Sequence, residues 1–165
     1  GWFDKRFMYE ESFHTPLIMM LPKGFDRRGD ITEMVQNIDY APTFIDIAGA
    51  PIPEDIQGVS LLPLLKGEQP DNGRESLYYH YYEYPAEHAV KRHYGVKKGD
   101  WKLIHFYNDI DVWELYNLKD DPYEMHNIYG KPGTEEKTKE MIDELHKLQQ
   151  QYDDPIETKL QEAKK

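Results

Sequence analysis

The chain has 165 residues, the length of one ordinary domain, and its formal charge of -11 reflects 31 acidic against 20 basic side chains. Nucleic-acid binding needs clustered Lys and Arg, so this balance argues against nucleic acid as the main partner. The absence of Cys excludes disulfides, thiolate chemistry and Cys-ligated zinc. The longest apolar run, residues 17–21, is far too short to span a bilayer, so no membrane span is predicted.

The first segments mix aromatic and charged residues and then become apolar. Residues 1–16 predict a loop with one helical turn around residues 8–12. Residues 17–21 lie in the run PLIMMLPKG, which is typical of a strand buried on both faces of a larger sheet. Such a strand exposes a sheet edge when its neighbours are missing. We therefore expect the chain to self-associate through this edge.

Two helices are expected next. The first begins after Asp39, which can act as its N-cap, and ends at Gly49. The second and shorter helix lies in GVSLLPLLKG, residues 58–67, with Ser60 as cap and Gly67 as stop. The apolar side chains of the first helix, which we expect to be buried, are Ile38, Phe44, Ile45, Ile47 and Ala48.

From residue 76 the pattern changes to short aromatic and β-branched runs separated by turn signals. The runs SLYYHYYEY, HAVKRHYGV, DWKLIHFYN and DVWELYNL predict a four-stranded antiparallel sheet. KKGD at 97–100 predicts a hairpin in which Gly99 takes a positive φ. A helix that starts at Thr134 should cover one face of the sheet with a stripe at helical spacing. The stripe consists of Met141, Ile142, Leu145, Leu148 and Tyr152.

These elements predict two parts of different fold class. Residues 1–70 have the pattern of the trailing strand and helices of an α/β domain. Residues 71–154 form a small α+β subdomain with a four-stranded antiparallel sheet and a C-terminal helix, and residues 155–165 form a polar tail.

Two stretches carry candidate chemistry, although the sequence has no P-loop, G-x-S-x-G or zinc-protease His pair. Residues 78–98, YYHYYEYPAEHAVKRHYGVKK, gather Tyr, His and cations in an otherwise acidic chain. Aromatic rings stack on the C–H faces of sugars, and cations pair with anionic groups, so this cluster suits a negatively charged sugar. The alternative interpretation is an aromatic core face beside a solvated charged face. Lys5, between Asp4 and Arg6, favours an anion contact, or else a solvated surface loop.

Four stretches together carry a family resemblance: GWFDKRFMYEESFHTPLI, NIDYAPTFIDIAGAPIPEDIQGVSLLPLLKG, HYGVKKGDWKLIHFY and WELYNLKDDPYEMHNI. In this order they resemble the C-terminal part of formylglycine-dependent sulfatases of the alkaline phosphatase superfamily, most closely bacterial carbohydrate sulfatases. Two positions depart from the pattern, since many relatives carry Arg at the position of His14 and often at that of Lys97.

The resemblance implies a parent enzyme that hydrolyses carbohydrate sulfate esters with calcium and formylglycine. Both cofactors belong upstream of this chain, and none is expected within it. Only Lys5 matches a catalytic position of the family, that of the lysine that contacts the sulfate oxygens. Because the nucleophile and the metal ligands are missing, the chain alone is expected to be inactive. The residues expected to bind substrate are Asp4, Arg6, His14, His80, His88, Arg92 and His93.

The expected substrate is a sulfated hexosamine of glycosaminoglycan or mucin chains, and the resemblance implies a periplasmic or secreted parent. Two alternatives stay open. One is a non-catalytic sugar-binding or interaction module. The other is a phosphate or phosphonate ester hydrolase of the same superfamily.

Overall fold

The structure is a computed structural model that describes residues 5–21, 23, 29–68 and 73–154. The chain divides into two compact units, one made of residues 1–16 with 76–165 and the other of residues 17–75. This division differs from the expected boundary at residue 70, because the N-terminal segment packs on the C-terminal sheet. The expected polar tail at 155–165 lies outside the described residues.

Four antiparallel strands form the centre of the first unit: β1 (Ser76–Tyr81), β2 (His93–Lys98), β3 (Trp101–Phe106) and β4 (Val112–Asn117). They lie side by side in the order β1-β2-β3-β4, which confirms the expected sheet. Gly99 has a φ of 55° in the turn between β2 and β3, as the KKGD signal predicts. The connection between β1 and β2, residues 82–92, is longer and forms the hollow described below.

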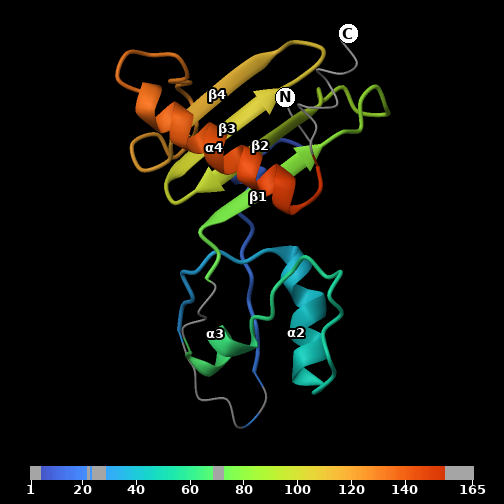
Figure 1. Ribbon diagram of the computed structural model, residues 1–165. Coiled ribbons are helices and arrows are strands. Elements are labelled where there is room, and N and C mark those ends of the chain that lie inside the picture. The colour runs from blue at the N-terminus through green and yellow to red at the C-terminus, as the bar shows by residue number, and fades with distance from the viewer. Residues whose placement is uncertain (1–4, 22, 24–28, 69–72, 155–165) are drawn as a thin grey trace. The chain divides into compact units, whose positions relative to one another are not determined.

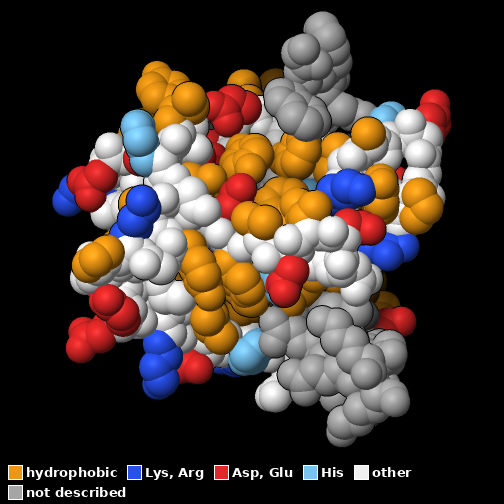
Figure 2. Space-filling view, turned by 90° about the horizontal axis from the view of Figure 1, so that it is seen from above, with side chains coloured by type: hydrophobic (Ala, Val, Ile, Leu, Met, Phe, Trp, Pro, Cys, Tyr) orange, Lys and Arg blue, Asp and Glu red, His pale blue; other side chains and the backbone are white. Residues whose placement is uncertain are grey.

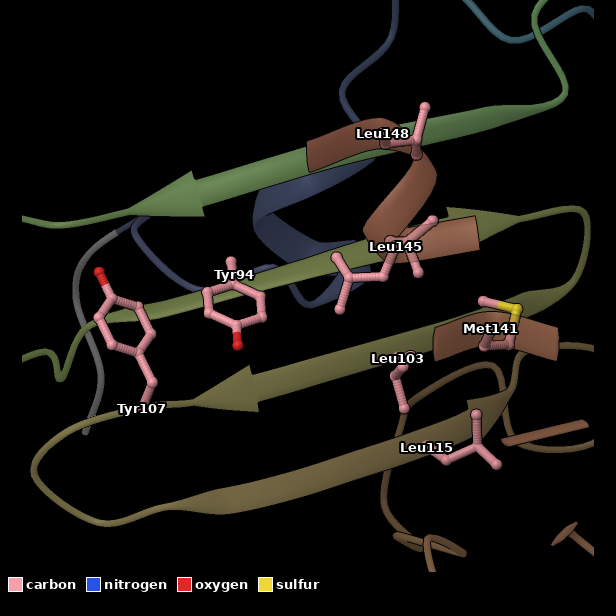
Figure 3. Close-up of a cluster of buried hydrophobic side chains, with 8 residues drawn as sticks. Tyr94, Leu103, Tyr107, Leu115, Met141, Leu145 and Leu148 are labelled. Atoms are coloured by element: carbon pink, nitrogen blue, oxygen red, sulfur yellow. The ribbon is translucent and has the colours of Figure 1, made fainter. Parts of the chain in front are cut away.

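One face of the sheet is covered by α4 (Glu135–Gln151), which begins directly after Thr134 as expected. Figure 1 shows this helix lying across the strands, and Figure 3 shows its side chains meeting those of the sheet. We call this side the α4 face. Its buried side chains are Tyr94, Val96, Leu103, Tyr107, Leu115, Met141, Leu145 and Leu148. Burial of apolar area on both partners fixes the helix to the sheet.

The opposite face, called here the N-terminal face, is covered by residues 5–13, which include α1 (Glu10–Phe13). In Figure 3 this dark blue segment passes on the other side of the strands from α4. Met8 is fully buried against Ile104 and Phe106. A Cβ on Gly95 would lie 2.6 Å from the Met8 sulfur and 2.4 Å from the Leu103 carbonyl oxygen. Only glycine at this position lets the N-terminal segment approach the sheet so closely.

The second unit contains η1 (Asn37–Asp39), α2 (Tyr40–Ile47) and α3 (Leu62–Lys66), at the positions expected for its helices. Asp39 precedes α2 but does not cap it through its side chain. Its buried carboxylate instead accepts hydrogen bonds from Arg74 (2.7 Å) and from the backbone N–H of Val59 (3.0 Å). Burial opposes ionisation of this carboxylate, but these donors outweigh it and hold the pKa of Asp39 below its usual value.

Two expectations for the second unit were wrong. Residues 17–21 have no strand assignment, and Ile18 and Met20 are 92% and 97% exposed. Helix α2 is not buried on its apolar side, since Phe44 is 64% exposed. The physical reason is shared: a strand needs a hydrogen-bonded neighbour and an apolar helix needs a covering layer, and the described residues supply neither.

Surface charges of both signs are interspersed with hydrophobic side chains on the face of the molecule shown in Figure 2. Within the described residues we find no helix with the length and hydrophobicity of a membrane span.

Candidate functional site

The segment that carries Lys5 and Arg6 is held on the N-terminal face by contacts with β1 and β2. The Tyr79 hydroxyl donates a hydrogen bond to the Arg6 carbonyl oxygen at 2.9 Å. The Phe7 ring stacks on that of His93, with 5.7 Å between centroids and 22° between planes. Lys5 itself is exposed. The backbone beside Lys5 is therefore fixed while its side chain reaches solvent.

A hollow of about 520 Å³ lies between this segment and the connection from β1 to β2. Its lining combines cations, carboxylates and tyrosine rings. The lining residues are Arg6, Tyr82, Glu83, Tyr84, Pro85, Ala86, Glu87, His88 and Arg92. Three of the residues that the sequence singled out thus line one hollow, and Arg6 comes from 82 positions before His88.

Hydrogen bonds shape the walls of this hollow. The Arg6 guanidinium contacts His88 Nε2, and Arg92 Nε donates to the Tyr82 carbonyl oxygen at 3.2 Å. The Lys91 ammonium bonds the Tyr84 hydroxyl and lies 3.8 Å from the centre of the Tyr84 ring. A guanidinium offers a planar fork of donors that suits sulfate or carboxylate oxygens. The wall can therefore receive an anionic, hydroxyl-rich ligand.

His93 lies under the N-terminal segment rather than in the wall of the hollow. It is fully buried, and its Nδ1 is 2.9 Å from the Lys91 carbonyl oxygen. Its ring packs 4.8 Å from that of Phe106. Burial lowers the pKa of His93 because the charged imidazolium is poorly solvated there. In this arrangement the neutral ring supports Phe7 and hence the segment above it.

The remaining expected residues are not brought to the hollow. His80 lies on the α4 face, with Nδ1 2.7 Å from an Asp154 carboxylate oxygen and Nε2 2.6 Å from the Tyr107 hydroxyl. His14 follows α1, and its exposed ring is 3.2 Å from the Glu10 carboxylate. Asp4 lies outside the described residues. A binding role for any of the expected residues stays a prediction.

Two groups of charged residues were left out of the site residues expected from the sequence. Glu83 and Glu87 line the hollow, and Lys102 is buried with Glu124 beneath the N-terminal segment. The signal for Lys102 was present, because strand alternation places it on the same face as Ile104. A cation on an otherwise apolar inward face indicates a buried ion pair.

The side chains of this chain do not form a metal site in the part that the structure describes. Those residues contain no group of three or more His, Asp or Glu side chains suited to hold a metal ion. They therefore do not fit the metal that the family resemblance implies. The roles assigned below to this chain are those that its own side chains can perform.

Sequence comparison gives the chain's relatives. Residues 1–151 match the family model of the C-terminal region of N-sulphoglucosamine sulphohydrolase. The chain is 54% identical over 156 residues to an N-acetylglucosamine-6-O-sulfatase of Bacteroides thetaiotaomicron, covering 93% of this chain and 28% of that protein. It is 32% identical over 151 residues to arylsulfatase K of Xenopus laevis, covering 88% of this chain and 28% of the relative.

Solved structures agree with these matches. One, a protein in complex with its substrate D-glucosamine-2-N,6-O-disulfate, superposes with a TM-score of 0.83 at 52% identity and covers 94% of this chain. A 2-O glycosaminoglycan sulfatase superposes with a TM-score of 0.64 at 25% identity and covers 73%. The chain spans 32% and 26% of these two proteins. The chain belongs to the sulfatase family of the alkaline phosphatase superfamily and corresponds to the C-terminal region of its members.

Proposed function

We propose that this chain is the C-terminal part of an enzyme that hydrolyses the 6-O-sulfate ester of glucosamine or N-acetylglucosamine. The observation that carries the proposal is the 54% identity to an N-acetylglucosamine-6-O-sulfatase across 93% of the chain. The 52% identical structure with bound D-glucosamine-2-N,6-O-disulfate supports the same sugar class. Sulfated chains of glycosaminoglycans or mucins are the proposed source, and a periplasmic or secreted location is proposed for the parent.

The geometry suggests how this chain's residues act. The exposed Lys5 ammonium supplies a compact positive charge for the sulfate oxygens. In the adjoining hollow, Arg6 and His88 offer donors to sugar oxygens, while the rings of Tyr82 and Tyr84 offer faces for sugar C–H groups. Their joint effect is to orient the ester beside Lys5, which lowers the barrier by positioning.

The rest of the chemistry belongs to the parent outside this chain. In the proposal, formylglycine and a calcium ion held by upstream residues supply the nucleophile and stabilise charge on the transferred group. Lys5 adds a further cation for the charge that builds up in the transition state. We expect the chain by itself to release no sulfate.

The alternatives have less support. Phosphonate monoester hydrolases share the fold with a TM-score of 0.59 at 22% identity, a likeness that concerns the fold alone. A non-catalytic sugar-binding module predicts tight binding of sulfated oligosaccharides by the chain without its parent. Calorimetric titration of the chain against such oligosaccharides separates this alternative from a part of an enzyme.

The test uses the full-length protein that contains this chain. Sulfate release is measured from N-acetylglucosamine carrying a 6-O-sulfate or a 3-O-sulfate, with the 6-phosphate as a further control. We expect turnover of the 6-O-sulfate, and Lys5→Ala should reduce kcat by about 10²- to 10³-fold, as for loss of one transition-state donor. Lys119→Ala, which removes an exposed lysine elsewhere, should leave kcat unchanged.

Two results would contradict the proposal. Turnover of the 3-O-sulfate or the phosphate in place of the 6-O-sulfate would overturn the proposed substrate. Full activity of the Lys5→Ala variant would remove the role assigned to Lys5.

A further inference from the structure

A lysine is fully buried at the centre of the sheet, beneath the segment that carries Lys5. Lys102 on β3 has no exposed surface, and its ammonium lies 2.7 Å from the carboxylates of Glu10 and Glu124. The same ammonium donates a hydrogen bond to the Met8 carbonyl oxygen at 2.7 Å. A buried ammonium is tolerated only when it is paired in this way. The ammonium is thus paired with two carboxylates and one backbone carbonyl oxygen.

The charges around Lys102 balance. Glu10 also accepts hydrogen bonds from Lys97 at 2.9 and 3.0 Å, so two lysines face two carboxylates. Burial by itself would raise the pKa of Glu10, but the hydrogen bonds from Lys102 and Lys97 outweigh burial and lower it. Glu124 in turn accepts a hydrogen bond from the backbone N–H of Glu10 at 2.6 Å. The network therefore fixes the backbone of the N-terminal segment by hydrogen bonds, in addition to its side chains.

The backbone groups that this network fixes lie close to Lys5 along the chain. Met8 follows Lys5 by three residues, and three residues span at most about 11 Å even when extended. The Arg6 carbonyl is held separately by the Tyr79 hydroxyl. The backbone is thus fixed at Arg6 and at Met8, and these two points set the direction in which the side chains of Lys5 and Arg6 leave the sheet.

We propose that Lys102 is a positioning residue for Lys5 and Arg6, acting by holding the Met8 carbonyl and the start of α1 against the sheet. This inference rests on the sulfatase function proposed above. Lys102 itself is buried and reaches neither the hollow nor its ligand. Its effect on catalysis passes through the backbone of residues 5–8.

The use of charged rather than apolar side chains beneath the N-terminal segment supports a positioning role for Lys102. A buried ion network is a weak source of stability, because an apolar cluster of the same volume is often as stable. The α4 face of the same sheet is closed mainly by apolar contacts, and its paired lysine, Lys98, is 30% exposed. Directed hydrogen bonds define one arrangement of a backbone, whereas apolar contacts tolerate several. The hydrogen bonds and ion pairs of Lys102 lie under residues 5–8, the segment whose geometry the proposed reaction needs.

The first experiment compares Lys102→Met with Lys98→Met in the full-length protein. Lys98 pairs with Glu144 and Glu140 at 3.3 and 3.6 Å on the opposite face. Lys98→Met is therefore a matched control, because it also removes a lysine paired with two glutamates. We expect Lys102→Met to lower kcat at least tenfold and to speed hydrogen exchange of the amides in residues 5–9 at least tenfold. Lys98→Met should change both by less than twofold.

The second experiment separates positioning from folding with the double variant Lys102→Met/Glu124→Gln. Glu124→Gln neutralises the carboxylate that Lys102→Met leaves unpaired. The midpoint temperature of thermal unfolding should therefore return toward that of the unchanged protein. We expect kcat to stay at least tenfold low, because the Met8 carbonyl still lacks its donor. Recovery of kcat together with the midpoint would overturn the proposal. The double variant also serves if Lys102→Met alone fails to fold.

Hydrogen exchange keeps this inference distinct from the proposed function. If the unchanged protein released no sulfate from any sulfated glucosamine, the proposed function would fail while the exchange measurement would still report on residues 5–9. Unchanged exchange of these amides in both Lys102 variants would overturn the positioning role whatever the enzyme's substrate.

Discussion

Both faces of one sheet are closed by apolar side chains, but only the N-terminal face encloses a lysine completely. On the α4 face, Leu103 and Leu115 pack against Leu145 in an apolar layer. On the N-terminal face, Lys102 and Glu124 are buried as ions beneath Met8. The first covering element follows the sheet directly in the chain, whereas the second comes from residues far earlier. The difference indicates that buried ions and directed hydrogen bonds add to apolar burial in setting where the N-terminal segment lies.

Another carboxylate on the N-terminal face, the partly buried Glu114, shows the same principle. Glu114 accepts hydrogen bonds from the hydroxyls of Tyr9 (2.9 Å) and Tyr116 (3.1 Å). Burial raises the pKa of Glu114 and also raises the pKa of both tyrosines above the ordinary range. Tyr9 follows Met8 in the chain, so this hydrogen bond adds another directed link between the N-terminal segment and β4.

The largest expected effect comes from breaking the ionic face. Lys102→Met leaves the buried Glu124 carboxylate without its cation and should lower the free energy of unfolding by about 3–5 kcal/mol. The opposing Lys98→Met removes a 30% exposed side chain and should cost less than about 1 kcal/mol. Hydrogen exchange of the amides of β2 and β3 measures both costs. Equal costs for the two variants would contradict the distinction between the faces.

A somewhat smaller effect is expected on the apolar face. Leu145 is fully buried, and Leu145→Ala should leave a cavity that costs about 2–5 kcal/mol. Because the apolar layer contributes stability without directing the N-terminal segment, kcat per folded molecule should change less than twofold. Exchange of the β3 amides and sulfate release, measured on the same preparation, test the two statements. A tenfold loss of kcat at full folding would show that this face also positions the segment.

The smallest expected effect concerns the pH dependence of the N-terminal face. His93 has a lowered pKa when folded, so below its ordinary pKa of 6.5 the unfolded chain binds a proton that the folded one does not. Stability from this group is therefore present above about pH 6.5 and is lost as pH falls toward the folded pKa. The loss is at most about 1.4 kcal/mol per pH unit. His93→Phe should flatten the dependence by that amount in unfolding experiments between pH 7 and pH 5, and an unchanged slope would contradict this account.

Part of the fold could be predicted from local pattern alone. The four strands alternate, their turns carry Gly99 or other turn residues, and the stripe from Met141 to Leu148 repeats at helical spacing. Neighbouring strands follow one another in the chain, so their pairing needs little long-range information. By contrast, the strand expected at residues 17–21 depends on partners that the described residues do not include, and pattern alone could not reveal their absence.

The candidate site was less predictable. Arg6, His88 and Arg92 were expected to bind substrate because of the family resemblance, and they lie together at the hollow. His80 was chosen by the same criteria but lies on the other face, with Asp154 and Tyr107. Residues of one type cluster in sequence whether or not they share a face. Successive side chains of a strand point to opposite faces of the sheet. His80 follows Tyr79 and precedes Tyr81 on β1, so it lies on the face opposite to theirs.

The sequence by itself determined the four strands of the sheet, the helices α2, α3 and α4, the balance of charge and the membership of the sulfatase family, because each depends on local spacing or on motifs in order. Only the tertiary structure decided that residues 5–13 lie on the sheet, that Arg6 meets His88, and that Lys102 is buried under Met8. These contacts join residues more than 80 positions apart. No local preference encodes such contacts, because they form only when one whole surface packs against another.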